Sequence, residues 1–266
     1  SALFMAAPIV APFMGTAVLT VAPWPWIFVV LAIIGAGVFL WIALRLPETL
    51  AVENRRPINP AGVADSARIV VADRQSLAYT IANACLSVTI MGFLTSVTLV
   101  FSQTLDQPEL LPYGFAAMAG VMMVASLVNA SIVRRFGMRR IGHSALIGLV
   151  FFAAVHVVVS LIFGDTLVSF VVLQSLMMAC FALCAGNFGA MAMENMGRVA
   201  GTASSLQGFV ATLVGALGGA AIGQSFDGTT VPLYIGVTLA GLVALFVIIR
   251  AEGRLFVPRH ADQGVN

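Results

Sequence analysis

The chain has 266 residues, of which 60% are hydrophobic and only 9% are charged, and its formal net charge is +2. A soluble chain carries about a quarter charged residues, so this composition excludes an ordinary soluble domain. Long runs of the sequence carry no Asp, Glu or Arg, and several reach the roughly 20 residues that a helix needs to cross about 30 Å of hydrocarbon. None alternates in the way a barrel strand does. The sequence therefore predicts an all-α, polytopic membrane helix bundle.

Eight transmembrane helices are expected along the chain. The opening charge-free run ends at Arg45, and the prolines of "APWPW" at 22–26 divide it into two helices. The expected spans cover roughly 2–21, 26–44, 77–101, 113–133, 143–163, 166–187, 199–223 and 232–249.

All basic residues are arginines, and they lie on alternate connections, after the second, fourth, sixth and eighth spans. The other connections contain no arginine, and their charged residues are all acidic: Asp106, Glu109, Asp165 and Asp227. Because positive residues favour the cytoplasmic side, both termini are expected in the cytoplasm, together with the cluster of four arginines at 134–140.

The organisation along the chain follows from the length of the connections. Four sections are expected: two spans in 1–46, a cytoplasmic linker in 47–76, a six-helix bundle in 77–250 and a cytoplasmic tail in 251–266. Asn59 before Pro60 is a good helix start and predicts a short surface helix over about 60–74. Its side chains expected toward the membrane are Val63, Ala67, Val70 and Val71.

Polar residues inside spans are costly unless they face protein or a water-filled cavity. They concentrate on the third, fourth, sixth and seventh spans, which are the candidate cavity-lining helices. Five methionines on the fourth and sixth spans could adapt to varied apolar ligands, with simple packing as the alternative: Met118, Met122, Met123, Met177 and Met178. The candidate cavity residues are Asn83, Ser87, Met122, Asn129, Gln174, Met178, Asn187 and Gln207.

Other residues have more limited interpretations. His156 is the ionisable residue deep inside a span, so it is a candidate for protonation, with a neutral packing histidine as the alternative. Glu194 near Arg198 is expected to form a solvated pair. Gly215, Gly219 and Gly223 leave one helix face without side chains and predict close helix packing.

No cofactor, metal site or enzymatic activity is expected. Cys85, Cys180 and Cys184 lie inside spans and are expected to pack as small apolar residues. They form no metal-binding spacing. The sequence has no HExxH, no GxSxG and no phosphate-binding glycine loop.

Several short stretches carry recognisable motifs. "RRFGMRRIG" contains Arg135, Gly137, Arg139 and Arg140, and "APIVAPFMGT" contains Pro8, Pro12 and Gly15. Three further stretches are "LPET" at 46–49, "GRVAGTASSLQGF" at 197–209 and "FDGT" at 226–229. Together they resemble the major facilitator superfamily, specifically its drug-proton antiporters of the bicyclomycin and chloramphenicol resistance type. The first two stretches are similar to the family's cytoplasmic loop signature and to the end of its antiporter signature. The other three resemble its sixth helix end, its eleventh helix and the exit of that helix.

The resemblance covers helices five to twelve of a twelve-helix family. It implies that residues 1–46 are the last two helices of an N-terminal half, that a C-terminal six-helix half is complete, and that four earlier helices are missing. It further implies proton-coupled efflux of small hydrophobic or amphipathic drugs across the bacterial inner membrane by alternating access. The arginine loop would act as a cytoplasmic gate. The implied partners are the lipid bilayer, a small-molecule substrate, protons and the missing N-terminal helices, with no nucleic acid.

Two alternatives stay open. The chain could belong to a metabolite carrier of the same superfamily, which a more charged cavity would favour. It could also be a non-transporting truncated scaffold or partner subunit.

Overall fold

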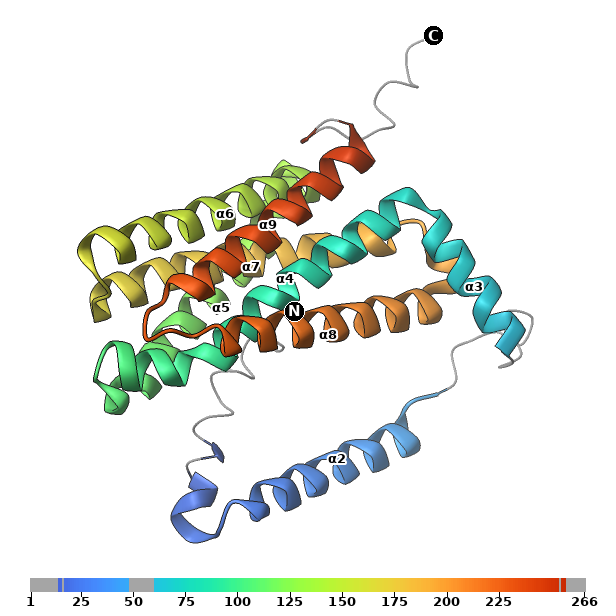
Figure 1. The fold of residues 1–266 in the computed structure, drawn as a ribbon. Coiled ribbons are helices and arrows are strands. Elements are labelled where there is room, and N and C mark those ends of the chain that lie inside the picture. The colour runs from blue at the N-terminus through green and yellow to red at the C-terminus, as the bar shows by residue number, and fades with distance from the viewer. Residues whose placement is uncertain (1–13, 16, 48–59, 254, 257–266) are drawn as a thin grey trace.

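The computed structural model describes residues 14–15, 17–47, 60–253, 255 and 256, and within them the chain is built of helices joined by short turns (Figure 1). In chain order the elements are α2 (Pro25–Arg45), α3 (Pro60–Ala72), α4 (Arg74–Leu99), η2 (Val100–Thr104), η3 (Pro108–Leu110), α5 (Leu111–Phe136), α6 (Met138–Phe163), α7 (Leu167–Met193), η4 (Gly197–Val199), α8 (Ala200–Gln224) and α9 (Val231–Glu252). The π-helical turn η2 continues α4 directly.

Seven helical segments of the described chain are long and apolar enough to cross a membrane, and they coincide with seven of the predicted spans. The remaining predicted span, over 2–21, lies largely outside the described residues. Several helices extend past the predicted ends, as α5 does to Phe136 and α7 to Met193. Hydropathy marks only the apolar part of each helix, whereas the hydrogen-bonded helix continues through polar residues at its ends.

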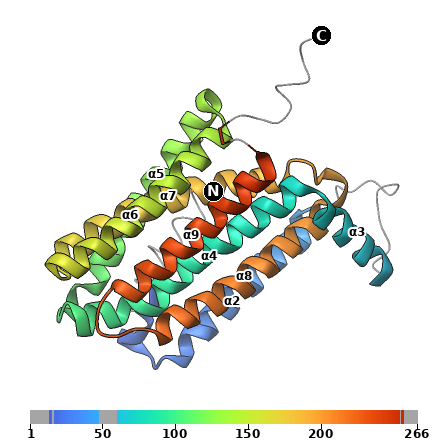
Figure 2. The same ribbon diagram turned by 45° about the horizontal axis from the view of Figure 1, so that its top comes forward.

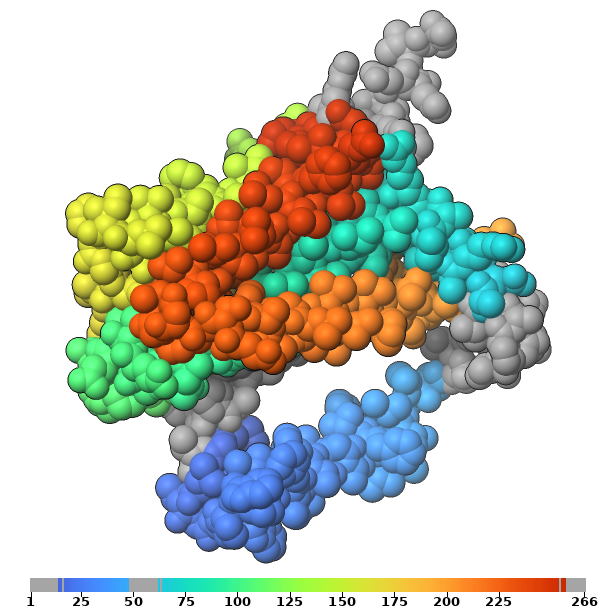
Figure 3. All heavy atoms as spheres, in the orientation of Figure 1, coloured from blue at the N-terminus to red at the C-terminus, as the bar shows by residue number. Residues whose placement is uncertain are grey.

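Helices α4 to α9 form one bundle (Figures 1 and 2). Helix α4 packs along α7, α8 and α9, while α6 packs on α7 and α9, and α5 packs on α7. Successive helices run in opposite directions, so one end of the bundle, here called the arginine-rich end, carries Arg74, Arg134, Arg135, Arg139, Arg140, Arg198 and Arg250. Helix α2 buries none of its residues and stands apart from the bundle surface in Figure 3.

Local chemistry sets several helix boundaries. The Asp73 carboxylate accepts the main-chain N–H of Ser76 and caps the start of α4. Thr166 and Ser169 form a capping box at the start of α7. Gly137 has a φ of +80° and open space where a Cβ would lie, so its backbone conformation, rather than crowding, requires glycine between α5 and α6.

Glycines bring α8 unusually close to α4, as the spacing of residues 215, 219 and 223 predicts. A Cβ on Gly219 would lie 2.6 Å from the Cβ of Met91, and one on Gly215 would lie 2.8 Å from the Cβ of Ser87. A Cβ on Gly223 would lie 3.1 Å from the Cβ of Thr95. The Thr95 hydroxyl also donates to the main-chain oxygen of Gly219 over 3.0 Å. The glycines of α8 therefore let its backbone lie directly against side chains of α4.

The short helix α3 is present as predicted, but its apolar side is used differently. Val70 is 1% exposed and packs with Met196, Val199 and Ala203 near the start of α8. Val71 is exposed, and the side chain of Val63 lies outside the described residues. Protein contacts thus cover Val70, which the sequence pattern alone assigned to the membrane.

Candidate functional site

A pocket of about 260 Å³ lies between α4, α7 and α8 and brings together three predicted cavity residues. Asn83 and Ser87 line it from α4, and Gln207 lines it from α8. The other described lining residues are Leu86, Phe181, Ala185, Ser204, Gly208 and Ala211. The described lining contains no ionisable side chain, so the pocket suits a neutral or weakly polar molecule.

The polar groups of this pocket retain hydrogen-bonding capacity. The Ser87 hydroxyl donates to the main-chain oxygen of Asn83, and this bond does not use the side-chain amide of Asn83. The Gln207 amide donates to the Sδ of Met193 over 3.2 Å, and a thioether is a weak acceptor. Two amides beside the Phe181 ring could therefore orient a ligand while apolar side chains supply most of the contact.

The other predicted cavity residues lie elsewhere. The Asn187 amide donates to Oδ1 of Asn129 over 2.9 Å and to the main-chain oxygen of Leu183 over 2.7 Å, so it links α7 to α5. Met122 and Met178 are 5% and 2% exposed and belong to the hydrophobic core. Gln174 is 1% exposed and accepts from the Tyr234 hydroxyl over 2.8 Å, so it bridges α7 to α9 rather than lining the pocket.

At the arginine-rich end, Arg139 is the centre of a network that joins four helices. Its guanidinium bonds to Glu252 over 2.9 Å and to Gln75 over 2.9 Å, and it lies 3.4 Å from Glu194. The amide of Gln75 donates to Glu194 over 2.6 Å. Glu194 is thus paired with Arg139 and Gln75, not with Arg198, because the start of α6 and the start of α4 lie next to the end of α7.

The same network contains residues that the sequence analysis did not single out. The Tyr79 hydroxyl donates to Glu252 over 2.6 Å and is 2.9 Å from Nε2 of His143. Nδ1 of His143 accepts the main-chain N–H of Phe256, past the end of α9. The sequence could have indicated that these residues share one end of the bundle, because they lie at the ends of neighbouring antiparallel helices. It could not have given the contacts, which depend on the rotation of each helix.

The remaining residues of the arginine loop are exposed. Arg134 and Arg140 are exposed, and the Arg135 guanidinium lies 5.4 Å from the centroid of the Phe136 ring. Among the described residues, ion pairs of this loop involve Arg139 alone. Of the antiporter-signature residues, Pro8 and Pro12 lie outside the described residues, and Gly15 has open space around the position of a Cβ.

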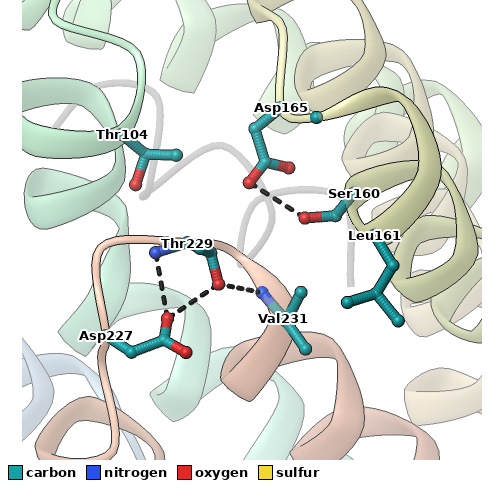
Figure 4. Close-up of a pocket in the computed structure, with 8 residues that line it drawn as sticks. Thr104, Ser160, Leu161, Asp165, Asp227, Thr229 and Val231 are labelled. Carbon is teal, nitrogen blue, oxygen red and sulfur yellow. Dashed lines mark hydrogen bonds between the residues drawn. The ribbon is translucent and has the colours of Figure 1, made fainter.

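The opposite end of the bundle holds a second polar cluster, around Asp165 (Figure 4). Asp165 accepts the Ser160 hydroxyl over 3.0 Å and both the hydroxyl and the main-chain N–H of Thr230, over 2.7 and 3.1 Å. These bonds tie the turn between α6 and α7 to the start of α9. Asp165 also lines a pocket of about 390 Å³ together with Asp227 and Thr229.

Asp227 differs from Asp165 in being held within its own turn. Hydrogen bonds from the hydroxyl and main-chain N–H of Thr229 hold the pKa of the Asp227 carboxyl below its usual value. It therefore stays ionised at neutral pH.

His156, on α6, lies next to Asp165. It is 0% exposed, its ring stacks on Tyr234 with centroids 3.7 Å apart, and its Nε2 lies 3.9 Å from Oδ1 of Asp165. That distance is too long for a hydrogen bond, and neither ring nitrogen has another partner in the described structure.

No group of three or more potential metal ligands occurs among the described residues, and Cys85, Cys180 and Cys184 are free thiols there.

The family model of the Major Facilitator Superfamily matches residues 1–219. The chain belongs to the Major Facilitator Superfamily. With seven candidate spans in its described part, it is a multi-pass membrane protein of a transporter family and not an enzyme.

Two curated relatives match most of the chain, one named as an MFS-type transporter and one as a bicyclomycin resistance protein homolog. The chain is 29% identical over 233 residues to the MFS-type transporter YdgK of Bacillus subtilis, covering 85% of the chain and 57% of the relative. It is 24% identical over 246 residues to a bicyclomycin resistance protein homolog of Haemophilus influenzae, covering 92% of the chain and 61% of the relative. The chain thus spans about three fifths of the length of these superfamily relatives.

Proposed function

We propose that the chain forms part of a secondary active transporter that exports small hydrophobic or amphipathic molecules by alternating access. The pocket between α4, α7 and α8 carries the proposal, because it combines the amides of Asn83 and Gln207 with apolar walls and has no ionisable described lining residue. The bicyclomycin resistance homolog gives independent support for drug-type substrates. A carrier of charged metabolites fits this lining less well, since charged substrates need charged or strongly hydrogen-bonding partners.

The size of the pocket supports a larger cavity made with another part of the transporter. Pockets that enclose drug-sized molecules measure about 300–1,000 Å³, whereas this pocket measures about 260 Å³. In the proposal, residues 77–250 are the C-terminal six-helix half and 1–46 are the last two helices of the N-terminal half. Residues 47–76 then link the halves, and 251–266 form a tail.

Proton entry across a bacterial inner membrane is proposed as the driving force, with both termini in the cytoplasm. The one-sided arginine distribution supports this orientation. His156 is proposed to exchange a proton with the cluster around Asp165, since its two ring nitrogens lack partners and Asp165 lies 3.9 Å away. The arginine loop would then close the cytoplasmic side through the exposed Arg135 and Arg140, with Arg139 fixing the loop to its own bundle.

Efflux by the complete protein in cells tests the substrate part of this proposal. Replacing Asn83 or Gln207 with leucine removes a polar group from the pocket, and the efflux rate of a fluorescent, neutral amphipathic drug should fall by up to about tenfold. Ser131→Ala, on the exposed side of α5, is the control and should leave the rate unchanged.

Two further measurements separate the parts of the proposal. A protonophore should abolish efflux if protons drive it, and His156→Asn should shift the pH at which efflux is half-maximal. Normal membrane insertion with unchanged efflux in both leucine variants would remove the pocket from the proposal. A purified protein that moves no drug and is retained by a stable partner would favour a scaffold instead.

A further inference from the structure

A shallow groove of about 220 Å³ runs between the start of α4 and the end of α9, at the arginine-rich end. Its described lining residues are Arg74, Leu77, Ala78 and Ile81 of α4 with Phe246, Val247, Arg250 and Ala251 of α9. Because α4 begins at Arg74 and α9 ends at Glu252, the two arginines lie at the helix ends. The larger apolar residues lie about one to two turns deeper: Leu77, Ile81, Phe246 and Val247. The groove is therefore basic at its outer end and apolar toward the middle of the bundle.

Both guanidinium groups are held over the groove by contacts that leave their charge unneutralised. Arg74 donates to the main-chain oxygen of Arg250, and the Arg250 guanidinium lies 5.9 Å from the centroid of the Phe246 ring. Both side chains belong to exposed residues, and in the described structure neither forms an ion pair.

The nearest acids along the chain are occupied by other partners. The Asp73 carboxylate accepts from the Ser76 main chain and from Asn195. Glu252 accepts from Arg139 and Tyr79. The two positive charges at the groove are thus left for an anion from outside the protein.

The lining favours one kind of anion. The basic end and apolar depth of the groove match a molecule with a phosphate head and hydrocarbon chains. Guanidinium groups bind phosphate oxygens with directed, charge-assisted hydrogen bonds, and basic pockets between transmembrane helices bind anionic headgroups.

We propose that this groove binds an anionic phospholipid. Arg74 and Arg250 hold the phosphate of the headgroup, and the exposed faces of Ile81 and Phe246 contact the first part of an acyl chain. This lipid site lies between α4 and α9 and is separate from the pocket between α4, α7 and α8.

Native mass spectrometry of the detergent-purified complete protein tests the site, with phosphatidylglycerol and phosphatidylcholine of identical chains as probes. Phosphatidylglycerol should be retained preferentially. Near a membrane surface each arginine contributes an affinity factor of about fivefold for anionic lipid. Arg250→Gln should therefore weaken phosphatidylglycerol binding about fivefold, and the double variant with Arg74→Gln about 30-fold. Arg250→Lys should retain most of the binding.

Arg198→Gln is the matched control, because Arg198 is an exposed arginine at the same end but outside the groove. Arg74 also bonds to the end of α9, so the double variant could lose folding; the single Arg250→Gln variant avoids this and decides the result on its own. Equal retention of phosphatidylcholine, or phosphatidylglycerol binding that is unchanged in Arg250→Gln, overturns the proposal. Displacement of phosphatidylglycerol by millimolar inorganic phosphate would assign the groove to free phosphate and also overturn it.

Discussion

Arg139 and Glu252 form the shortest ion pair of the described structure: Nε of Arg139 donates to Oε1 of Glu252 across 2.9 Å and joins the start of α6 to the end of α9. The Glu252 side chain is 7% exposed, whereas that of Glu194, the second acid near Arg139, is 43% exposed. The two carboxylates therefore differ in how much water screens their interaction with the same arginine.

Glu252→Ala should lower the stability of the bundle by about 3 kcal/mol, because it leaves a largely buried guanidinium without its main partner. Glu194→Ala should cost less than about 1 kcal/mol, since solvent weakens the exposed pair. Thermal unfolding in detergent measures both. Equal losses of Tm would show that burial does not separate the two pairs.

Substitutions in the arginine loop should fall into two kinds, those that reduce stability and efflux and those that reduce efflux alone. Arg139→Ala should reduce both Tm and efflux, whereas Arg135→Ala should reduce efflux with an unchanged Tm, since the described contacts of Arg135 are limited to Phe136. Replacing Gly137 with valine forces a branched residue to a φ of +80° and should also reduce efflux while insertion continues. Normal efflux at normal expression in Arg135→Ala and Gly137→Val would exclude the gate.

Gly219→Ala should destabilise the α4–α8 contact, because the new methyl group would lie 2.6 Å from the Cβ of Met91 and 2.9 Å from its main-chain carbon. Gly201→Ala is the control on the same helix, where nothing lies within 4 Å of the new methyl group. That control should raise stability by up to about 1 kcal/mol through helix propensity. Comparing the two Tm values checks the contact, and a gain in both variants would contradict close packing at Gly219.

Asp165→Asn should loosen the end of the bundle opposite the arginines. The carboxylate accepts three hydrogen bonds, whereas an amide keeps one oxygen acceptor and has no negative charge. One hydroxyl of Ser160 or Thr230 then has to turn its proton away, and the remaining bonds lose their charge-assisted strength, at a cost of about 1–3 kcal/mol. Asp227→Asn should cost much less, because its bonds stay within one exposed turn. Hydrogen exchange at the start of α9 is the measurement; equal protection in wild type and Asp165→Asn would argue against the tie.

The helices were predictable because the membrane imposes length and apolar composition on each span, and these are properties of the sequence itself. The close approach of α8 was predictable for a similar reason, since Gly215 and Gly219 mark one helix face. The partners of individual side chains were harder to predict from the sequence. Gln174 looks like a cavity residue in sequence, but the rotation of α7 turns it toward Tyr234 of α9.

The partners of Arg139 illustrate the same limit. Its contacts lie 64, 55 and 113 residues away in sequence, at Gln75, Glu194 and Glu252. Antiparallel topology predicts that these residues share one end of the bundle, but it does not say which acid meets which arginine. Arg198 was the nearer partner of Glu194 in sequence, yet Arg139 of a neighbouring helix lies closer in space.

The glycine contact between α4 and α8 has a consequence for molecular selectivity. The pocket that holds Asn83 and Gln207 lies beside this contact, on the same two helices. Because the contact fixes the spacing of α4 and α8, it also fixes the distance between those two amides. The α7 side of the pocket is formed by Phe181 and Ala185, and an aromatic ring can change its rotamer where a backbone contact cannot yield. Ligand width would therefore be accommodated by Phe181, and substitutions at this one position should alter which molecular sizes are accepted while the spacing of the polar groups stays constant.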